Sequence, residues 1–273
     1  MTDGPPRCLA PLRRLLQCLL QRVLPRHCLL CGQPSGEAEL CAPCRSDLPR
    51  APLSCRGCAA PLPAAPDANP AAAPGGSPYT STGAPPDTPP HDLVCGRCLR
   101  RPLPWDQAIA ALVYGFPADR LVCRFKFNRD LAAGVVLARE LLDAIRRSGQ
   151  DLPHAIVPVP LHRTRHFSRT FNQAELLALH LGRELGIPVH SRLLARSRRT
   201  SAQSGLDAAA RRRNLRGAFR LAAPRERLPP GCHLALVDDV LTTGVTLAEC
   251  SRTLKRAGAA RISVWVVARA PAP

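Results

Sequence analysis

The fold is decided by the stretch Leu234-Ala235-Leu236-Val237-Asp238-Asp239-Val240-Leu241-Thr242-Thr243-Gly244-Val245-Thr246. An apolar strand ends in two acids, and a turn rich in Thr and Gly then opens a helix. Amides at a helix N-terminus and threonine hydroxyls can surround a phosphate, and a glycine lets the backbone approach it closely. Acids at the carboxyl end of a strand face the ligand crevice of an open α/β sheet, where they can bind sugar hydroxyls or metal-bound water. The stretch predicts a phosphate site; an ordinary strand-turn-helix with an N-capping threonine is the alternative.

The same alternation of strands and helices extends outward from this stretch. From about residue 105, β-like apolar runs alternate with segments of helical periodicity, as in an α/β domain with a mostly parallel sheet. We expect such a domain over residues 105–273. The predicted strands are 108–114, 155–159, 233–237 and 262–268, and the predicted helices are 119–127, 134–147, 173–185 and 246–257.

Length and composition bound the rest of the chain. Its 273 residues predict about two folded units at roughly 150 residues each. The 45% apolar and 21% charged residues exclude a wholly disordered or collagen-like chain. The formal net charge of +18 favours a phosphate-bearing partner or a nucleic-acid backbone. No apolar run reaches the roughly 18 residues of a membrane span, so no transmembrane segment is expected. Residues 1–25 carry apolar side chains at helical spacing, which predicts an N-terminal amphipathic helix.

Eight of the 13 cysteines form four Cys-x-x-Cys pairs. In a chain without a secretion signal, such pairs indicate the reducing cytoplasm and metal binding rather than disulfides. Tetrahedral Zn²⁺ takes four thiolates, so four pairs make two closed, structural zinc sites. The predicted ligands are Cys28, Cys31, Cys41, Cys44, Cys55, Cys58, Cys95 and Cys98.

The pairing of these motifs stays open at this point. Sequential pairing gives two tandem zinc ribbons over residues 26–100, and a cross-braced arrangement is the alternative. Gly32 and Gly57 lie beside the pairs, where a tight turn needs a positive φ. Residues 61–90 are rich in Pro and Ala and predict a disordered insertion between the third and fourth pairs. The remaining cysteines are expected to be small buried apolar residues: Cys8, Cys18, Cys123, Cys232 and Cys250.

Residues 238–246 resemble the phosphoribosyl diphosphate (PRPP) motif of type I phosphoribosyltransferases. The whole chain is identified as a member of the ComF family of competence proteins, in which zinc-ribbon cysteines precede such a domain. The resemblance implies a type I phosphoribosyltransferase-like open, mostly parallel sheet preceded by a small Cys-rich double zinc ribbon. It also rests on Val157-Pro158-Val159-Pro160-Leu161, Phe171-Asn172-Gln173-Ala174, Gln203, Arg213-Asn214 and Gly217-Ala218-Phe219.

The resemblance implies roles for particular residues. Asp238 and Asp239 would hold the ribose hydroxyls as the catalytic acids, with Mg²⁺ as a cofactor beside the two zinc ions. The implied PRPP-binding residues are Thr242, Thr243, Gly244, Val245 and Thr246 for the 5′-phosphate and Pro158 and Val159 in the loop that receives the diphosphate. Arg169 and Lys126 are the predicted cationic contacts, with an ordinary surface position as the alternative for Lys126. The family commonly has glycine where this chain has Thr170, and a β-branched residue would strain a loop that needs a positive φ.

Three functions are compatible with these motifs. As an enzyme, the chain would transfer phosphoribose from PRPP with Mg²⁺ and release diphosphate. As a binding protein, it would sense PRPP without turnover. As a cytoplasmic competence protein, it would handle single-stranded DNA during uptake and natural transformation, with proteins of the competence machinery as partners. The acceptor, the oligomeric state and the role of the insertion are not encoded in any motif.

Overall fold

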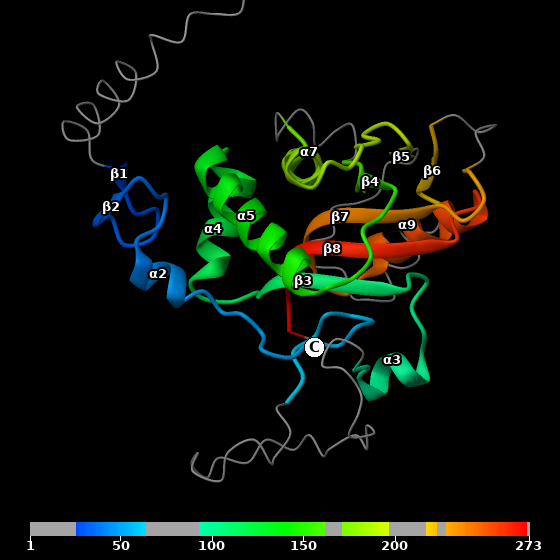
Figure 1. Cartoon of the computed structure of the whole chain (residues 1–273), viewed down its shortest axis with the longest axis horizontal. Helices are drawn as coiled ribbons and strands as arrows, with labels where there is room; N and C mark the ends of the chain where they lie inside the picture. Colours follow the sequence, from blue (N-terminus) through cyan, green and yellow to red (C-terminus); the bar gives the residue numbers. More distant parts are fainter. Residues whose placement is uncertain (1–25, 64–92, 162–170, 197–216, 223–227, 272–273) are drawn as a thin grey trace, which may run out of the picture. The chain divides into compact units, whose positions relative to one another are not determined.

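The structure is a computed structural model that describes residues 26–63, 93–161, 171–196, 217–222 and 228–271 (Figure 1). The helix predicted over residues 1–25 and most of the predicted insertion therefore lie outside the described residues, as does Thr170. Two compact units divide between Leu48 and Pro49. The smaller unit contains the antiparallel strands β1 (Arg26–His27) and β2 (Pro34–Gly36), followed by the short helix α2 (Ala42–Ser46).

The larger unit is built on a parallel sheet. Its strands are β3 (Gln107–Val113), β4 (Ala155–Pro158), β7 (His233–Leu241) and β8 (Arg261–Arg269), in the order β3-β8-β7-β4. All three neighbouring pairs are parallel, and Val189 adds a parallel bridge to Ile156 on the outer edge of β4. The predicted mostly parallel α/β sheet is confirmed.

The order of the strands creates a switch point between β4 and β7. From β4 the chain crosses to the outer bridge at Val189, whereas from β7 it crosses in the opposite direction to β8. Open α/β sheets bind ligands at the carboxyl ends of strands where the order reverses in this way. The topology therefore places a binding crevice at the ends of β4 and β7.

Helices cover both faces of the sheet, so its strands are apolar on both sides. On one face, α5 (Leu131–Arg147) packs beside α7 (Gln173–Leu185), with α4 (Ala118–Phe127) against α5 (Figure 1). On the other face, α9 (Val245–Arg256) shares a buried cluster with alternate residues of β7 and with the antiparallel pair β5 (Leu194–Arg196) and β6 (Phe219–Leu221). The short α3 (Gly96–Arg100) precedes β3. No helix among the described residues is both long and apolar enough to cross a membrane.

The eight predicted elements are all present, but α5 begins at Leu131 and not at residue 134, because the Asp130 side chain caps it there. The short elements β1, β2, β5, β6, α2 and α3 were not predicted, and one strand ends later than expected. The strand expected to stop at residue 237 continues to Leu241 and includes both acids. The reason is tertiary: β8 runs alongside as far as Arg269, which pairs with Leu241 and keeps the parallel ladder intact. Local sequence signalled the end of the apolar run but not the length of the neighbouring strand.

The unpaired cysteines behave in two ways. Cys232 and Cys250 are buried as predicted, and burial raises the pKa of each thiol. Cys123 is exposed, so its predicted burial is wrong. It lies on α4, where Leu121 and Phe125 take the buried side of the helix. Cys8 and Cys18 lie outside the described residues.

Candidate functional site

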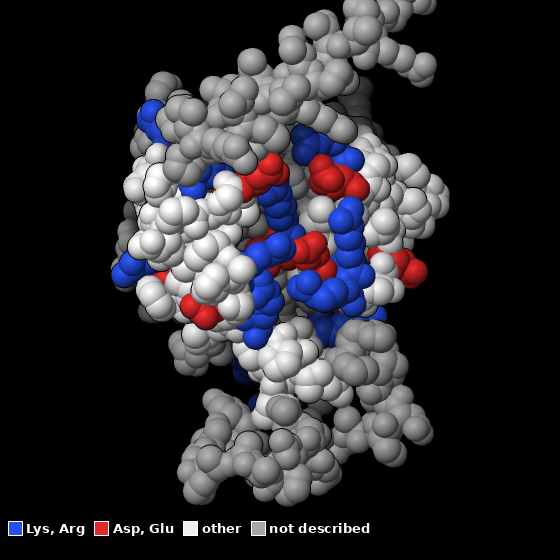
Figure 2. Space-filling model, turned by 60° about the vertical axis from the view of Figure 1, so that its left-hand side comes forward, with Lys and Arg blue, Asp and Glu red and all other residues white. Residues whose placement is uncertain are grey.

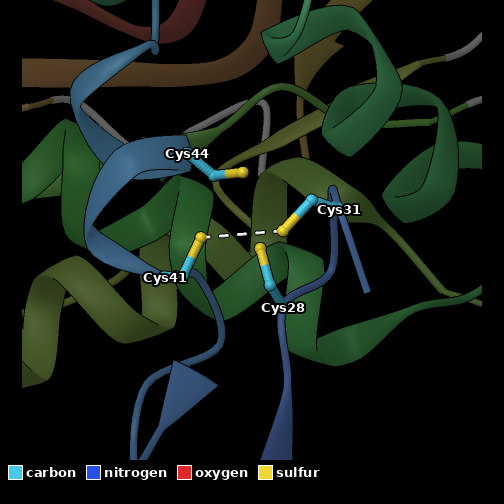
Figure 3. A group of neighbouring side chains, drawn as sticks. All are labelled: Cys28, Cys31, Cys41 and Cys44. Carbon is cyan, nitrogen blue, oxygen red and sulfur yellow. Dashed lines mark hydrogen bonds between the residues drawn. The ribbon is translucent and has the colours of Figure 1, made fainter. Parts of the chain in front are cut away.

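Four cysteine sulfurs converge in the smaller unit. The Sγ atoms of Cys28, Cys31, Cys41 and Cys44 all lie within 4.8 Å of one another and point toward a common centre (Figure 3). Cys31 and Cys41 Sγ are 3.7 Å apart. The first pair sits in a turn where the Gly32 amide donates to the Cys28 carbonyl at 2.9 Å, and Gly32 has the expected positive φ of 75°.

A second cluster of four sulfurs belongs to the larger unit. The Sγ atoms of Cys55, Cys58, Cys95 and Cys98 also lie within 4.8 Å of one another. Cys58 and Cys95 Sγ are 3.8 Å apart, and the Cys95 amide donates to Cys55 Sγ at 3.2 Å. The structure therefore shows the sequential pairing and rejects the cross-braced alternative.

Gly57 serves this second cluster for a reason other than the predicted one. Its φ is not positive; the positive φ near this turn, 52°, belongs to Ala59. A Cβ on residue 57 would instead lie 3.2 Å from both Cβ and Sγ of Cys98. Glycine at this position leaves room for the fourth cysteine to approach the other three.

The donor sets fit zinc. The hydrogen bond with Cys58 lowers the pKa of Cys55 to about 4 against the opposing effect of burial, with the Cys95 amide assisting, and the same bond raises the pKa of Cys58. At Cys28, burial is outweighed by hydrogen bonds from backbone amides, which lower the pKa to about 6. Four thiol ligands with neither His nor carboxylate form the closed tetrahedral set of a structural zinc site. The two four-cysteine clusters thus support two zinc ions.

A cavity of about 340 Å³ occupies the predicted crevice at the carboxyl ends of β4 and β7. It brings together most of the residues expected to bind PRPP. Pro158, the last residue of β4, is buried in the sheet next to the cavity, and Arg169 lies outside the described residues. The cavity-lining residues among those predicted are Lys126, Val159, Asp238, Asp239, Thr242, Thr243, Gly244, Val245 and Thr246.

An ion pair crosses the floor of this cavity. Lys126 Nζ lies 3.0 Å from Asp239 Oδ1, with the two side chains 19% and 16% exposed. Asp238 Oδ1 accepts from the Asp239 amide at 2.9 Å, and Asp239 Oδ1 accepts from the Val240 amide at 2.6 Å. These bonds hold both carboxylates in place at the rim of β7. Lys126 is therefore a residue of the cavity and not a freely solvated surface lysine.

The loop 242–246 also lines the cavity, and we name it the phosphate loop after the role that the sequence predicts for it. Gly244 is the N-cap residue of α9, with φ 75° and ψ 3°. Since glycine has no side chain, it offers the first-turn amides of α9 no capping group, and the first turn contains no acidic residue. The amides and the positive end of the helix dipole are therefore available to an anion.

Several cavity residues were not predicted as site residues. Asn172 caps α7 by accepting from the Ala174 amide at 3.2 Å, and its Nδ2 donates to the Val159 carbonyl at 3.2 Å. It thereby ties the start of α7 to the loop after β4. Tyr114 also lines the cavity, and burial, with nearby Cys123, raises its pKa. Tyr114 is the last residue of a predicted strand, and Asn172 belongs to the motif Phe171-Asn172-Gln173-Ala174. Neither position in the sequence predicts that the side chain lines the cavity.

Comparison with known proteins agrees with this architecture. Residues 19–74 match the double zinc ribbon domain family. The chain is 43% identical over 181 residues to DNA utilization protein YhgH of Salmonella typhimurium, covering 65% of this chain and 78% of that protein. It is 42% identical over 180 residues to competence protein F of Haemophilus influenzae, covering 64% and 78%. Among solved structures it is similar to glutamine PRPP amidotransferase from B. subtilis complexed with ADP and GMP, at 15% identity and a TM-score of 0.33, covering 50% of this chain and 26% of that one.

The double zinc ribbon match, the parallel sheet and the two four-cysteine clusters together define a zinc-ribbon protein with an open, parallel α/β domain. Because the overlap with the solved structures is partial, the family assignment rests on the sequence relatives. The chain belongs to the ComF family of competence proteins, together with DNA utilization protein YhgH and competence protein F.

Proposed function

We propose that the cavity binds PRPP together with Mg²⁺. The observation that carries this proposal is the juxtaposition of two fixed carboxylates with an uncapped helix N-terminus across one cavity at the switch point. A sugar phosphate needs both features, because its hydroxyls donate hydrogen bonds and its phosphate accepts them. The volume of about 340 Å³ falls within the roughly 300–1,000 Å³ of ligand pockets.

Each part of PRPP has a complementary region in the cavity. The phosphate loop would receive the 5′-phosphate, and Asp238 and Asp239 would accept hydrogen bonds from the ribose hydroxyls. The diphosphate would lie over the loop that follows β4, where Asn172 holds the Val159 carbonyl. Lys126 can turn from Asp239 toward the incoming diphosphate, so the resident ion pair is exchanged for one with the ligand.

Transfer of phosphoribose with diphosphate release is the reaction that this binding mode allows. Mg²⁺ would neutralise the charge that develops on the leaving diphosphate. The chain would hold the ribose and both ends of the ligand, which is catalysis by positioning and charge stabilisation. A sensor that binds PRPP without turnover uses the same contacts, and diphosphate release separates the two functions.

Calorimetric titration of PRPP with Mg²⁺ into the zinc-loaded protein tests the proposal. We expect Asp238→Asn combined with Asp239→Asn to weaken binding by at least tenfold, because hydrogen bonds to charged groups contribute about 1.5–3 kcal/mol each. Asp151→Asn is the matched control, since this carboxylate is 84% exposed and pairs with Arg261 at the amino end of β8. Equal binding by the double variant and the wild type, or no binding by the wild type, would overturn the proposal.

A second function, the handling of single-stranded DNA in the cytoplasm during DNA uptake, is favoured by charge. The chain carries 38 Lys and Arg against 20 Asp and Glu, and basic side chains gather around acidic ones on the face shown in Figure 2. The relatives are named for competence and DNA utilization. Binding to the phosphate backbone should weaken steeply between about 50 and 200 mM salt. A salt-independent affinity for an oligonucleotide would argue against this function.

A further inference from the structure

Trp105 connects the second zinc cluster to the phosphate loop. Its Nε1 donates to the Gly57 carbonyl at 2.6 Å, within the turn between Cys55 and Cys58. The other edge of the same ring faces the loop: a Cβ on Gly244 would lie 3.0 Å from Trp105 Cη2. The ring is 5% exposed and therefore cannot move without displacing its neighbours.

Arg269 makes a second connection from the next carbonyl of the same turn. It ends β8, is 4% exposed, and its Nε donates to the Cys58 carbonyl at 2.9 Å. Its Nη1 donates to the Leu241 carbonyl at 2.9 Å and to the Thr242 carbonyl at 2.8 Å, and also to Ala270. One buried guanidinium thus joins the metal-binding turn to the residues where the phosphate loop begins.

A second cavity borders the phosphate loop on the side of Trp105. It has a volume of about 280 Å³ and is lined by Cys58, Cys98, Trp105, Thr242, Thr243 and Arg269 among others. Trp105 and Arg269 line this cavity and connect the turn 55–58 with the phosphate loop along its wall. Both side chains donate hydrogen bonds to carbonyls of the turn 55–58. A small Cys-rich segment of this kind takes its fixed shape from bound metal.

We propose that Trp105 and Arg269 are positioning residues for the phosphate loop and that zinc in the Cys55–Cys98 cluster holds them in place. The inference rests on the proposed PRPP function of the loop. It makes the affinity for a sugar phosphate depend on the second cluster, whose metal lies outside the ligand cavity. By thermodynamic reciprocity, bound PRPP also stabilises zinc in this cluster.

The first test compares variants of the two positioning residues with a control variant at the opposite end of β8 from Arg269. Trp105→Phe removes both the donor to Gly57 and the outer edge of the indole that faces Gly244, and Arg269→Gln removes most of the donors to the loop. Each should weaken PRPP binding by roughly tenfold in calorimetry. Arg261→Gln is the matched control at the opposite end of β8, where its partners are Asp151 and Gln107, and it should bind like the wild type. Wild-type affinity in both positioning variants would overturn the proposal.

A fluorescence measurement on the folded protein distinguishes a loss of loop positioning from a folding defect in the variants. Trp105 and Trp265 are the two tryptophans of the chain, so in a Trp265→Phe background the fluorescence reports on Trp105. Addition of PRPP with Mg²⁺ should change this emission in the zinc-loaded protein. A response that persists unchanged after the second cluster loses its zinc would contradict the proposed dependence.

The second test measures zinc release from each cluster. A Cys41→Ser variant disables the first cluster, so a zinc-selective chelator then reports on the second, and Cys58→Ser gives the reverse. PRPP with Mg²⁺ should slow release from the second cluster by a factor of roughly ten and leave the first unaffected. Equal effects on both clusters, or none, would overturn the inference.

Failure of the inference is distinguishable from failure of the proposed function. If the wild type does not bind PRPP, amide hydrogen exchange still reports on the phosphate loop. Exchange at residues 242–246 should accelerate when the second cluster loses zinc and when Arg269 is replaced by Gln. Unchanged exchange in both cases would reject the proposed positioning, whatever the ligand.

Discussion

Gly244→Ala should destabilise the larger unit and its phosphate loop together. The residue has φ 75°, where an L-side chain costs roughly 1–2 kcal/mol. Its new Cβ would lie 3.0 Å from Trp105 Cη2 and 3.3 Å from Leu241 Cδ1, closer than ordinary van der Waals contact. Trp105 is held at its far edge by the bond to Gly57, and overpacking of this kind adds about 1–3 kcal/mol. The free energy of unfolding should fall by roughly 2–5 kcal/mol.

Gly186→Ala is the control that separates the cost of backbone strain from the cost of the steric contact with Trp105 and Leu241. Gly186 ends α7 with φ 69°, and nothing lies within 4 Å of the position its Cβ would take. Urea unfolding should therefore show the loss of about 1–2 kcal/mol from strain alone. Calorimetry should show unchanged PRPP binding in Gly186→Ala and binding weakened at least tenfold in Gly244→Ala. Equal destabilisation of the two variants would refute the contact argument, and full PRPP affinity in Gly244→Ala would refute the assignment of the loop.

Three further predictions concern the sheet and its helices. His233 is buried beside Ser263, and burial, with Arg261 and His154, lowers its pKa to about 4. The unfolded state takes up a proton on this histidine near pH 6.5, whereas the folded state does not. The free energy of unfolding measured in urea should therefore fall by about 2 kcal/mol between pH 7 and pH 5. A His233→Gln variant with the same pH profile would contradict this. Arg50→Ala deprives buried Glu140 of its 2.7 Å ion pair and should cost about 2–4 kcal/mol, whereas Arg183→Ala, from an exposed pair, should stay within about 0.5 kcal/mol; equal thermal shifts would argue against it. Gly134→Ala places a Cβ 2.5 Å from Phe125 Cε2 between α4 and α5 and should cost about 1–3 kcal/mol, which unchanged thermal unfolding would exclude.

Much of the candidate site could be predicted because its parts are contiguous in the chain. The two acids and the phosphate loop occupy nine consecutive positions, 238–246, so a single sequence motif contains both groups of cavity residues. Each Cys-x-x-Cys pair is equally local, since two residues between the sulfurs suffice to point both at one ion. The roles of Lys126 and Asn172 depend on contacts with β7 and with the loop after β4, and no local pattern encodes those contacts.

The sequence-based predictions were wrong where packing against another element decided the structure. The end of β7 depends on β8, the exposure of Cys123 depends on which side of α4 meets the core, and Gly57 is required by Cys98 from a distant segment. Periodicity describes one element at a time. The element packed against it supplies the rest of the information.

The sequence by itself determined the parallel α/β class, the local pairing of the cysteines, and the location of a loop rich in Thr and Gly at the start of a helix. These features follow from periodicity, residue chemistry and short spacings, which act within a few residues. Only the tertiary structure decided which cysteine pairs share an ion, that the strand order reverses between β4 and β7, and that Trp105 and Arg269 join the second cluster to the phosphate loop. The physical reason is that these contacts join segments far apart in the chain, and their geometry exists only once the sheet has set the strands in register.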